Sequence, residues 1–250
     1  MVKYEVRFLY DKAALLLYSE EKKYLVLGDI HIGLEKKLHD KGVRLYGNAE
    51  RMAKQIVQLV RENEASGVIL LGDIKESILY PDTTERAEIL EFFDILKGID
   101  LEIVVGNHDG HLDEIVKMPI EKELVVGNVA MLHGHMWPSE EAMSKEYLIV
   151  AHNHVAVSIK DEKGAIYNEK AWILASLNEK GARERYKNAN KRIKLIVMPA
   201  FNELITGKPV GMLDERHINP LFRNGIFDYE NANVYSISGS ILGTPKTLSR

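Results

Sequence analysis

Short apolar segments that end abruptly in Asp, Asn or His recur along the chain. The first is residues 24–27, which run into Gly28-Asp29-Ile30-His31, and the later ones are residues 68–71, 101–105, 129–132 and 147–150. Their Val, Ile and Leu content is typical of buried strands. In open sheets flanked by helices, ligands bind outside the strand ends. The pattern therefore predicts a sheet protein whose strand ends deliver oxygen and nitrogen donors to a site.

The segments between the first three of these strands have helical periodicity. A helix is expected over about 49–65, capped by Asn48 and ended by Gly67, with apolar positions at Met52, Ile56, Leu59 and Val60. A second is expected between Asp82 or Thr83 and Gly98, with apolar positions at Ala87, Leu90, Phe93 and Leu96. Strands over 4–10 and 13–18 precede them. The β-α-β-α-β order predicts a parallel sheet with crossover helices.

The second half of the chain has shorter apolar runs and tighter turns. Short helices are expected over 111–117 and from Ser139, and a hairpin is expected at Gly127-Asn128 between strands 122–126 and 128–132. Further strands are expected over 155–159, 165–167, 171–174, 193–198 and 233–238, and irregular loop over 203–232. We therefore predict an α/β fold, a four-layer αββα sandwich of two mixed sheets with helices outside. A single domain would span 1–250, with core motifs in 22–160 and a C-terminal extension over 178–250.

Composition narrows the possible functions. The chain has 250 residues, of which 46% are hydrophobic, so it can bury a large core. Its net charge of -4 argues mildly against strong binding to long duplex DNA. The absence of cysteine excludes disulfides, thiolate chemistry and Cys-based zinc sites. Residues 1–5 do not begin a signal peptide, and no apolar run approaches the length of a membrane span, so we expect a cytoplasmic protein with no membrane contact.

Two basic segments leave a choice open. Residues 178–192 contain six Lys or Arg, and Lys36, Lys37, Lys41 and Arg44 follow the first motif. Such charge runs are usually solvated surface, and we favour this interpretation for both segments. The alternative is contact with an anionic partner for the first segment and with a substrate phosphate for the second.

The polar residues at the strand ends form a set of oxygen and imidazole donors, which suits manganese, iron, zinc or similar divalent ions. The candidate ligands are Asp29, His31, Asp73, Asn107, His133, His152 and His154. Seven ligands exceed the need of one ion and suit two ions if one carboxylate bridges them. Two neighbouring ions promote in-line displacement at phosphorus, with a bound hydroxide as nucleophile.

His108 lies one residue from the candidate ligand Asn107 and borders the site without joining the set. We expect it to act as general acid or to stabilise the transition state. Asp109 is expected to orient His108 by accepting its second ring proton. His135 is extra, and we favour a position in the outer shell or on the surface over one that reaches the metal or substrate.

The five motifs together resemble those of the calcineurin-like metallophosphoesterases. They are Gly28-Asp29-Ile30-His31, Gly72-Asp73, Gly106-Asn107-His108-Asp109, His133-Gly134-His135 and His152-Asn153-His154, in the family's order. The resemblance implies that Asp29, His31 and His154 hold a first metal, that Asp73 bridges, and that Asn107, His133 and His152 hold a second. It implies His108 as the catalytic histidine. Lys75-Glu76 and Ala151 depart from the usual motifs without replacing a ligand.

Residues 71–75 and 197–202 resemble more closely the Icc-like subgroup, which is related to DNA-repair exonucleases whose bacterial members often accompany a helicase or ligase. This implies a phosphodiesterase, with nucleic acid and small cyclic nucleotides both open as substrates and a helicase as a possible partner. Two divalent ions are implied, with Mn2+ expected and Fe, Zn, Ni or Co as alternatives. Two other hypotheses remain: a phosphomonoesterase for a small metabolite, and a metal-dependent, non-catalytic scaffold for a helicase or nuclease.

Overall fold

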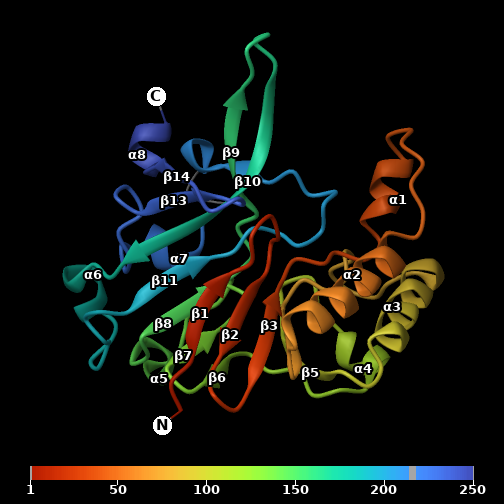
Figure 1. Ribbon diagram of the computed structural model, residues 1–250, viewed down its shortest axis with the longest axis horizontal. Coiled ribbons are helices and arrows are strands. Elements are labelled where there is room, and N and C mark those ends of the chain that lie inside the picture. The colour runs from red at the N-terminus through yellow and green to blue at the C-terminus, as the bar shows by residue number, and fades with distance from the viewer. Residues whose placement is uncertain (1, 214–217, 250) are drawn as a thin grey trace.

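The computed structural model describes residues 2–213 and 218–249. Its first sheet has the order β1-β2-β3-β4-β5 (Figure 1). The outer pair β1–β2 and the pair β2–β3 are antiparallel, whereas β3, β4 and β5 run parallel. The strands span Glu5–Phe8, Leu15–Tyr18, Lys23–Leu27, Gly67–Leu71 and Asp100–Val104. The predicted β-α-β-α-β unit is therefore present.

The second sheet follows the order β12-β9-β10-β11-β8-β7-β6, with β13 on β10 and β14 on β13. It is mixed, because β8 pairs parallel with both β7 and β11 while the β6–β7 hairpin and the β9–β10 hairpin are antiparallel. In chain order β6 to β14 span Leu124–Val126, Val129–Met131, Tyr147–Val150, Val155–Lys160, Ile166–Ser176, Lys194–Val197, Lys208–Pro209, Asn233–Ser236 and Ile241–Gly243.

Three hydrophobic clusters show the layers. One lies between the sheets and joins Leu17 and Ile69 of the first to Ile149 and Trp172 of the second. A second joins the first sheet to α2 (Asn48–Asn63), α3 (Thr83–Ile95) and α4 (Leu112–Val116). The third joins the second sheet to α5 (Glu140–Met143), α6 (Glu179–Arg183) and α7 (Pro220–Arg223). Two mixed sheets flanked by helices confirm the predicted fold class.

Two helix predictions need correction. The apolar positions expected for α3 only partly match its buried face: Leu96 is buried, but Leu90 is exposed, and Ile89 and Phe92 are buried instead. Glu85 lies on the same buried face, where its carboxylate accepts hydrogen bonds from the backbone of residues 76 and 77. Asp82 caps α3 as predicted. Asn48 is the first residue of α2 rather than its cap, and Gly67 begins β4 rather than ending the helix.

Two predictions for the second half of the chain also need correction. The strands predicted over 165–167 and 171–174 are one long strand, β10, which pairs with β9 through its first half and with β11 and β13 through its second. The predicted loop over 203–232 contains β12, the 3-10 helix Val210–Met212 and α7, although its residues 214–217 lie outside the described part. The helix α8 (Pro245–Leu248) follows β14.

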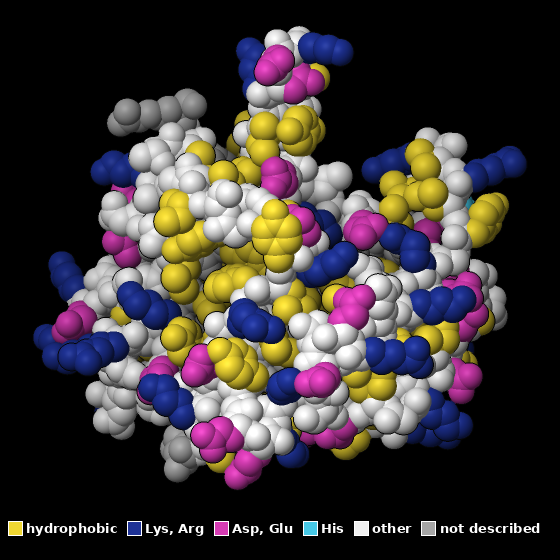
Figure 2. All heavy atoms as spheres, in the orientation of Figure 1, with side chains coloured by type: hydrophobic (Ala, Val, Ile, Leu, Met, Phe, Trp, Pro, Cys, Tyr) yellow, Lys and Arg dark blue, Asp and Glu magenta, His cyan; other side chains and the backbone are white. Residues whose placement is uncertain are grey.

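Two segments project from the body: α1 (Leu34–His39) and the β9–β10 hairpin (Figure 1). Figure 2 shows Lys and Arg side chains dispersed over this face among Asp and Glu, rather than gathered in one patch. In the basic segment 178–192, Arg183 and Lys191 pair with Glu179, and Arg185 lies over the ring of Trp137. Among the described helices, none is long and apolar enough to cross a membrane.

Candidate metal centre

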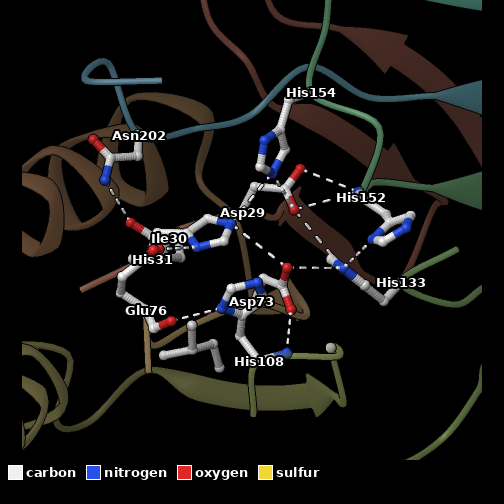
Figure 3. A network of polar contacts seen from close by, with 12 residues as sticks. Asp29, Ile30, His31, Asp73, Glu76, His108, His133, His152, His154 and Asn202 are labelled. Atoms are coloured by element: carbon white, nitrogen blue, oxygen red, sulfur yellow. Dashed lines mark hydrogen bonds and ion pairs between the residues drawn. The ribbon is translucent and has the colours of Figure 1, made fainter. Parts of the chain in front are cut away.

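Four loops that leave or enter strand ends meet at one place (Figure 3). Asp29 follows β3, Asp73 follows β4, His133 follows β7, His152 follows β8, and His154 immediately precedes β9. The loops after the parallel strands continue the pairing of the sheets, since the N–H of Asp29 donates to the Gly72 carbonyl at 3.0 Å and that of His31 to the Asp73 carbonyl at 2.9 Å. Six of the seven predicted ligands therefore lie together.

The backbone at this place is in an uncommon conformation. Asp29, His31, Asp73, His152 and His154 have φ between 44° and 70°, the left-handed region. Such conformations cost about 1–3 kcal/mol each for residues other than glycine and gather at functional sites. Asp and His tolerate this region better than β-branched residues do. Through these turns, side chains two residues apart in the chain, Asp29 with His31 and His152 with His154, are brought to the same site.

The predicted ligands fall into two groups of ligand atoms, and a further cluster joins His31 to Glu76 and His108. The first contains Asp29, His31, Asp73 and His154, and the second contains Asp73, His133 and His152. In the first group His31 Nε2 lies 3.2 Å from His154 Nε2 and 3.5 Å from Asp73 Oδ2. In the second group His133 Nε2 lies 3.2 Å from Asp73 Oδ2 and 3.2 Å from His152 Nδ1. The same oxygen of Asp73 thus faces both groups.

The buried carboxylate and imidazole side chains of the site strongly shift one another's pKa values. Burial opposes the charged form of Asp73, but the hydrogen bond and charge of His133 outweigh it and hold the pKa of that carboxyl well below its usual range. Burial likewise opposes protonation of His133, yet Asp73 raises its pKa to about 9. Burial and the charge of His133 lower the pKa of His152 to about 4. Closely coupled carboxylates and imidazoles of this kind cluster at functional sites.

The arrangement fits divalent metal ions. Ring nitrogens that face each other at 3.2 Å, as in His31–His154 and His133–His152, can share at most one proton and otherwise oppose lone pairs. A cation between them removes this conflict. Two ligands that each lie about 2.0–2.2 Å from one ion are themselves separated by about 3–4.4 Å, which includes the contacts found here. Imidazole and carboxylate donors leave the identity of the metal open.

Asn107, the seventh predicted ligand, is exposed in the turn after β5, between Gly106 and His108. Its role as a ligand stays a prediction. His108 lies beside the first group, with its ring 5.0 Å from that of His31. Its backbone N–H donates to Asp73 Oδ1 at 2.9 Å, and its Nδ1 lies 2.6 Å from the carbonyl oxygen of Glu76. Because a carbonyl only accepts, Nδ1 carries a proton and Nε2 is available to a substrate.

The predicted contact between Asp109 and His108 is wrong. Asp109 is buried, and its carboxylate accepts hydrogen bonds from the N–H groups of Gly106 at 2.7 Å and of Ile74 at 2.8 Å. Burial and the nearby Asp73 raise the pKa of Asp109. It therefore ties the loop after β4 to the turn after β5. A side chain at Gly106 would overlap the backbone nitrogen and a carboxylate oxygen of Asp73, so glycine is required there.

The sequence reasoning missed the partner of His31, which is Glu76. This buried carboxylate lies 2.7 Å from His31 Nδ1 and also contacts Lys37. Burial opposes its charge, but the hydrogen bonds from His31 and Lys37 lower its pKa to about 2. Its neighbour Lys75 is fully buried, and its ammonium donates to the carbonyls of Ser77, Leu79 and His108. The only signal in the sequence was the departure of Lys75-Glu76 from the usual motif.

A second missed contribution comes from the segment after β11. The side chain of Asn202 is buried and donates to the carbonyl of Ile30 at 2.8 Å, while the amide of Asn48 donates to Asn202 at 3.1 Å (Figure 3). The ammonium of Lys170 donates to the carbonyls of Ala200 and Asn202, and burial lowers its pKa to about 8. These contacts hold the Asp29–His31 turn from behind.

His135 lies at the edge of the second group, with its ring 5.4 Å from that of His133. Its Nδ1 is buried and has no hydrogen-bond partner among the described residues. Burial and the charge of His133 lower its pKa to about 4, so it is a neutral imidazole near the second group. Whether His135 belongs to the outer shell or reaches the metal or substrate stays a prediction.

The chain is similar to known proteins in sequence pattern and in fold. A family model for the calcineurin-like phosphoesterases matches residues 22–197. Among solved structures, the Pseudomonas putida nuclease MPE has a TM-score of 0.58 at 16% identity over 96% of this chain and 100% of that chain. Yfce, a phosphoesterase from E. coli, has a TM-score of 0.42 at 13% identity over 88% and 96%. No curated protein matches by sequence.

At such identities the solved structures show the fold alone, and the family model carries the assignment. Its match covers more than half of the chain, including the five motifs and all residues that meet at the strand ends. Members of the family are metal-dependent hydrolases of phosphoesters, and the two groups of ligand atoms suit that chemistry. The chain therefore belongs to the calcineurin-like phosphoesterases.

Proposed function

We propose that this protein is a two-metal phosphodiesterase that cleaves nucleic acid. The observation that carries the proposal is the position of Asp73 Oδ2, which faces both His31 and His133 and so joins the two groups of ligand atoms through one oxygen. When bound, two ions supply positive charge to the phosphate oxygens and lower the pKa of the attacking water. Mn2+ is the expected ion, and Fe, Zn, Ni and Co suit the same donors.

The residues of the chain divide the remaining work. Asp29, His31 and His154 would hold the first ion, Asn107, His133 and His152 the second, and Asp73 both. His108 donates its Nδ1–H to the carbonyl of Glu76, so its imidazolium form, which also carries a proton on Nε2, would give that second proton to the departing oxygen and become the neutral imidazole. Glu76 fixes the ring of His31 by accepting its Nδ1–H, and Asp109 fixes the turn that carries His108.

A diester is favoured over a monoester by the charges near the site. Three lysines beside it are already committed: Lys37 to Glu76, and Lys75 and Lys170 to backbone carbonyls. The metal ions and His108 must then offset the phosphate charge. A diester carries one negative charge where a monoester carries up to two, so it needs less compensation. This supports a diesterase without distinguishing among diesters.

Nucleic acid is favoured among diesters by the similarity, over nearly the whole chain, to a structure described as a nuclease. The similarity is one of fold, so the substrate remains our proposal. A role in DNA repair and a helicase partner stay predictions of the resemblance to the Icc-like subgroup, and a cytoplasmic location stays a prediction from composition and from the lack of long apolar runs. Turnover of monoesters far above diesters would instead favour the small-metabolite phosphatase.

Hydrolysis of bis-p-nitrophenyl phosphate and of p-nitrophenyl phosphate with added Mn2+ tests the proposal directly. We expect diester turnover that requires metal, and a loss of about 10²–10⁴-fold in His108→Ala if proton transfer is the role of this residue. Metal content measured in the same samples separates a lost proton donor from a lost ion. Two bound ions with no diester turnover in the wild type would contradict the proposal and favour the scaffold hypothesis.

A further inference from the structure

Three consecutive large apolar side chains are exposed two residues after Glu76, which supports the metal centre. Ile78, Leu79 and Tyr80 are 60%, 67% and 63% exposed, and we call them the apolar lip. Scattered exposed apolar residues are ordinary, but a contiguous group marks an interaction site. The lip lies in the loop between β4 and α3, which also carries Asp73.

The backbone of the lip is held firmly although its side chains are free. The buried ammonium of Lys75 donates to the carbonyls of Ser77 and Leu79, which turns the polar backbone inward and the side chains outward. Glu85 of α3 accepts the N–H of Ser77 at 2.9 Å. A Cβ at Gly110 would lie 2.5 Å from the carbonyl oxygen of Ile78, so the two loops are in close contact. Exposure here is therefore built in and does not reflect a loose segment.

Tyr80 is presented as a flat surface. Its ring stacks on the imidazole of His111, with centroids 4.0 Å apart and planes inclined by 18°. His111 Nδ1 is itself 2.8 Å from a carboxylate oxygen of Glu114, which fixes the supporting ring. One face of the Tyr80 ring is covered by His111 in this way, and the rest of the ring faces solvent, since the residue is 63% exposed.

The backbone of the lip is tied to that of His108 by one buried lysine. The same nitrogen of Lys75 lies 2.7 Å from the carbonyl oxygen of Leu79 and 2.6 Å from that of His108. His111, the support of Tyr80, follows His108 by three residues in the same turn. The lip is therefore on the side of the metal centre that carries His108.

We propose that Tyr80, with Ile78 and Leu79, holds an unstacked nucleobase next to the scissile phosphate. An aromatic ring with one supported and one open face suits base stacking, which tolerates any base because each has a π-face. Bases in an intact duplex are already stacked, so the substrate would be a single-stranded or frayed nucleic acid. The inference rests on the proposed function, because it assumes a phosphodiester that carries a base.

A pair of chromogenic diesters with one leaving group tests the lip. Thymidine 5'-(p-nitrophenyl phosphate) carries a base, and methyl p-nitrophenyl phosphate does not. With Mn2+ present, we expect Tyr80→Ala to lower kcat/KM for the nucleotide ester by about 5- to 150-fold, the range of one base–aromatic stack, and to leave the methyl ester nearly unchanged. Tyr80→Trp should keep the preference. The matched control is Tyr10→Ala, an exposed tyrosine beyond β1.

Binding gives a second readout that needs no turnover. Fluorescence anisotropy compares a labelled single-stranded oligothymidine with an abasic strand of equal length, and Tyr80→Ala should remove the advantage of the strand with bases. Equal loss on both diesters, or an unchanged preference in Tyr80→Ala, would overturn the assignment of the lip and leave the diesterase standing. Failure of the wild type to cleave either diester would refute the proposed function, and the lip assignment with it.

Discussion

Glu76 allows a specific test of the metal centre, because among the predicted ligands its carboxylate contacts His31, a member of the first group of ligand atoms. Its carboxylate accepts the Nδ1–H of His31, while the neighbouring contact to His108 uses the backbone carbonyl of the same residue. Glu76→Ala therefore removes the support of His31 and keeps that of His108. We expect weaker binding of the ion held by Asp29, His31 and His154, with little change at the other ion.

The size of the expected loss in metal affinity follows from the burial of His31. His31 is buried, so the loss of the carboxylate leaves an N–H without a partner, at a cost of about 1–3 kcal/mol. Loss of a group that orients a metal ligand typically lowers affinity by about 10- to 100-fold, or about 1.4–2.7 kcal/mol, and the two estimates agree. Glu76→Gln keeps an acceptor without the charge, and its effect should fall between wild type and Glu76→Ala.

Titration of Mn2+ into chelator-treated protein by calorimetry measures the two affinities separately. One of them should fall in Glu76→Ala, and kcat at saturating Mn2+ should return close to the wild-type value because His108 is still oriented. Glu50→Ala, at an exposed residue paired with Lys54, is the control. Wild-type affinity at both sites in a folded Glu76→Ala would refute the reasoning, as would a loss of activity that excess metal does not restore.

Two further predictions concern the bridge and a buried lysine. Asp73→Ala should lose both ions and activity together, because Asp73 Oδ2 faces both groups, and two ions per chain in that variant by elemental analysis would exclude the bridging role. Burial lowers the pKa of Lys170 to about 8 from 10.5, so between these pH values the unfolded chain binds more protons than the folded one. The free energy of unfolding of the wild type should therefore rise from pH 8 to 10.5 by about 3 kcal/mol relative to that of Lys170→Met. Urea unfolding of both proteins over this pH range measures the difference, and an equal change of the free energy of unfolding in both would contradict the prediction.

The candidate site was largely predictable because its donors follow strands whose apolar character is local. Asp29, Asp73, His133 and His152 each come directly after a buried run, and parallel strands bring such ends to one edge. The same reasoning was less successful for α3, where apolar spacing alone selected Leu90, which is exposed. It also missed Glu85, whose buried carboxylate accepts hydrogen bonds from backbone amides of the loop after β4.

The sequence by itself determined the family, the order of the elements and the ligand types, since these depend on short-range periodicity and on residues next to strand ends. Only the tertiary structure decided which groups support the ligands. Glu76 holds His31 across 45 residues, and Asn202 holds Ile30 across 172. Asp109 binds backbone amides instead of the neighbouring His108. Such partners are set by how distant loops meet when the two sheets pack, and no local pattern in the chain encodes that meeting.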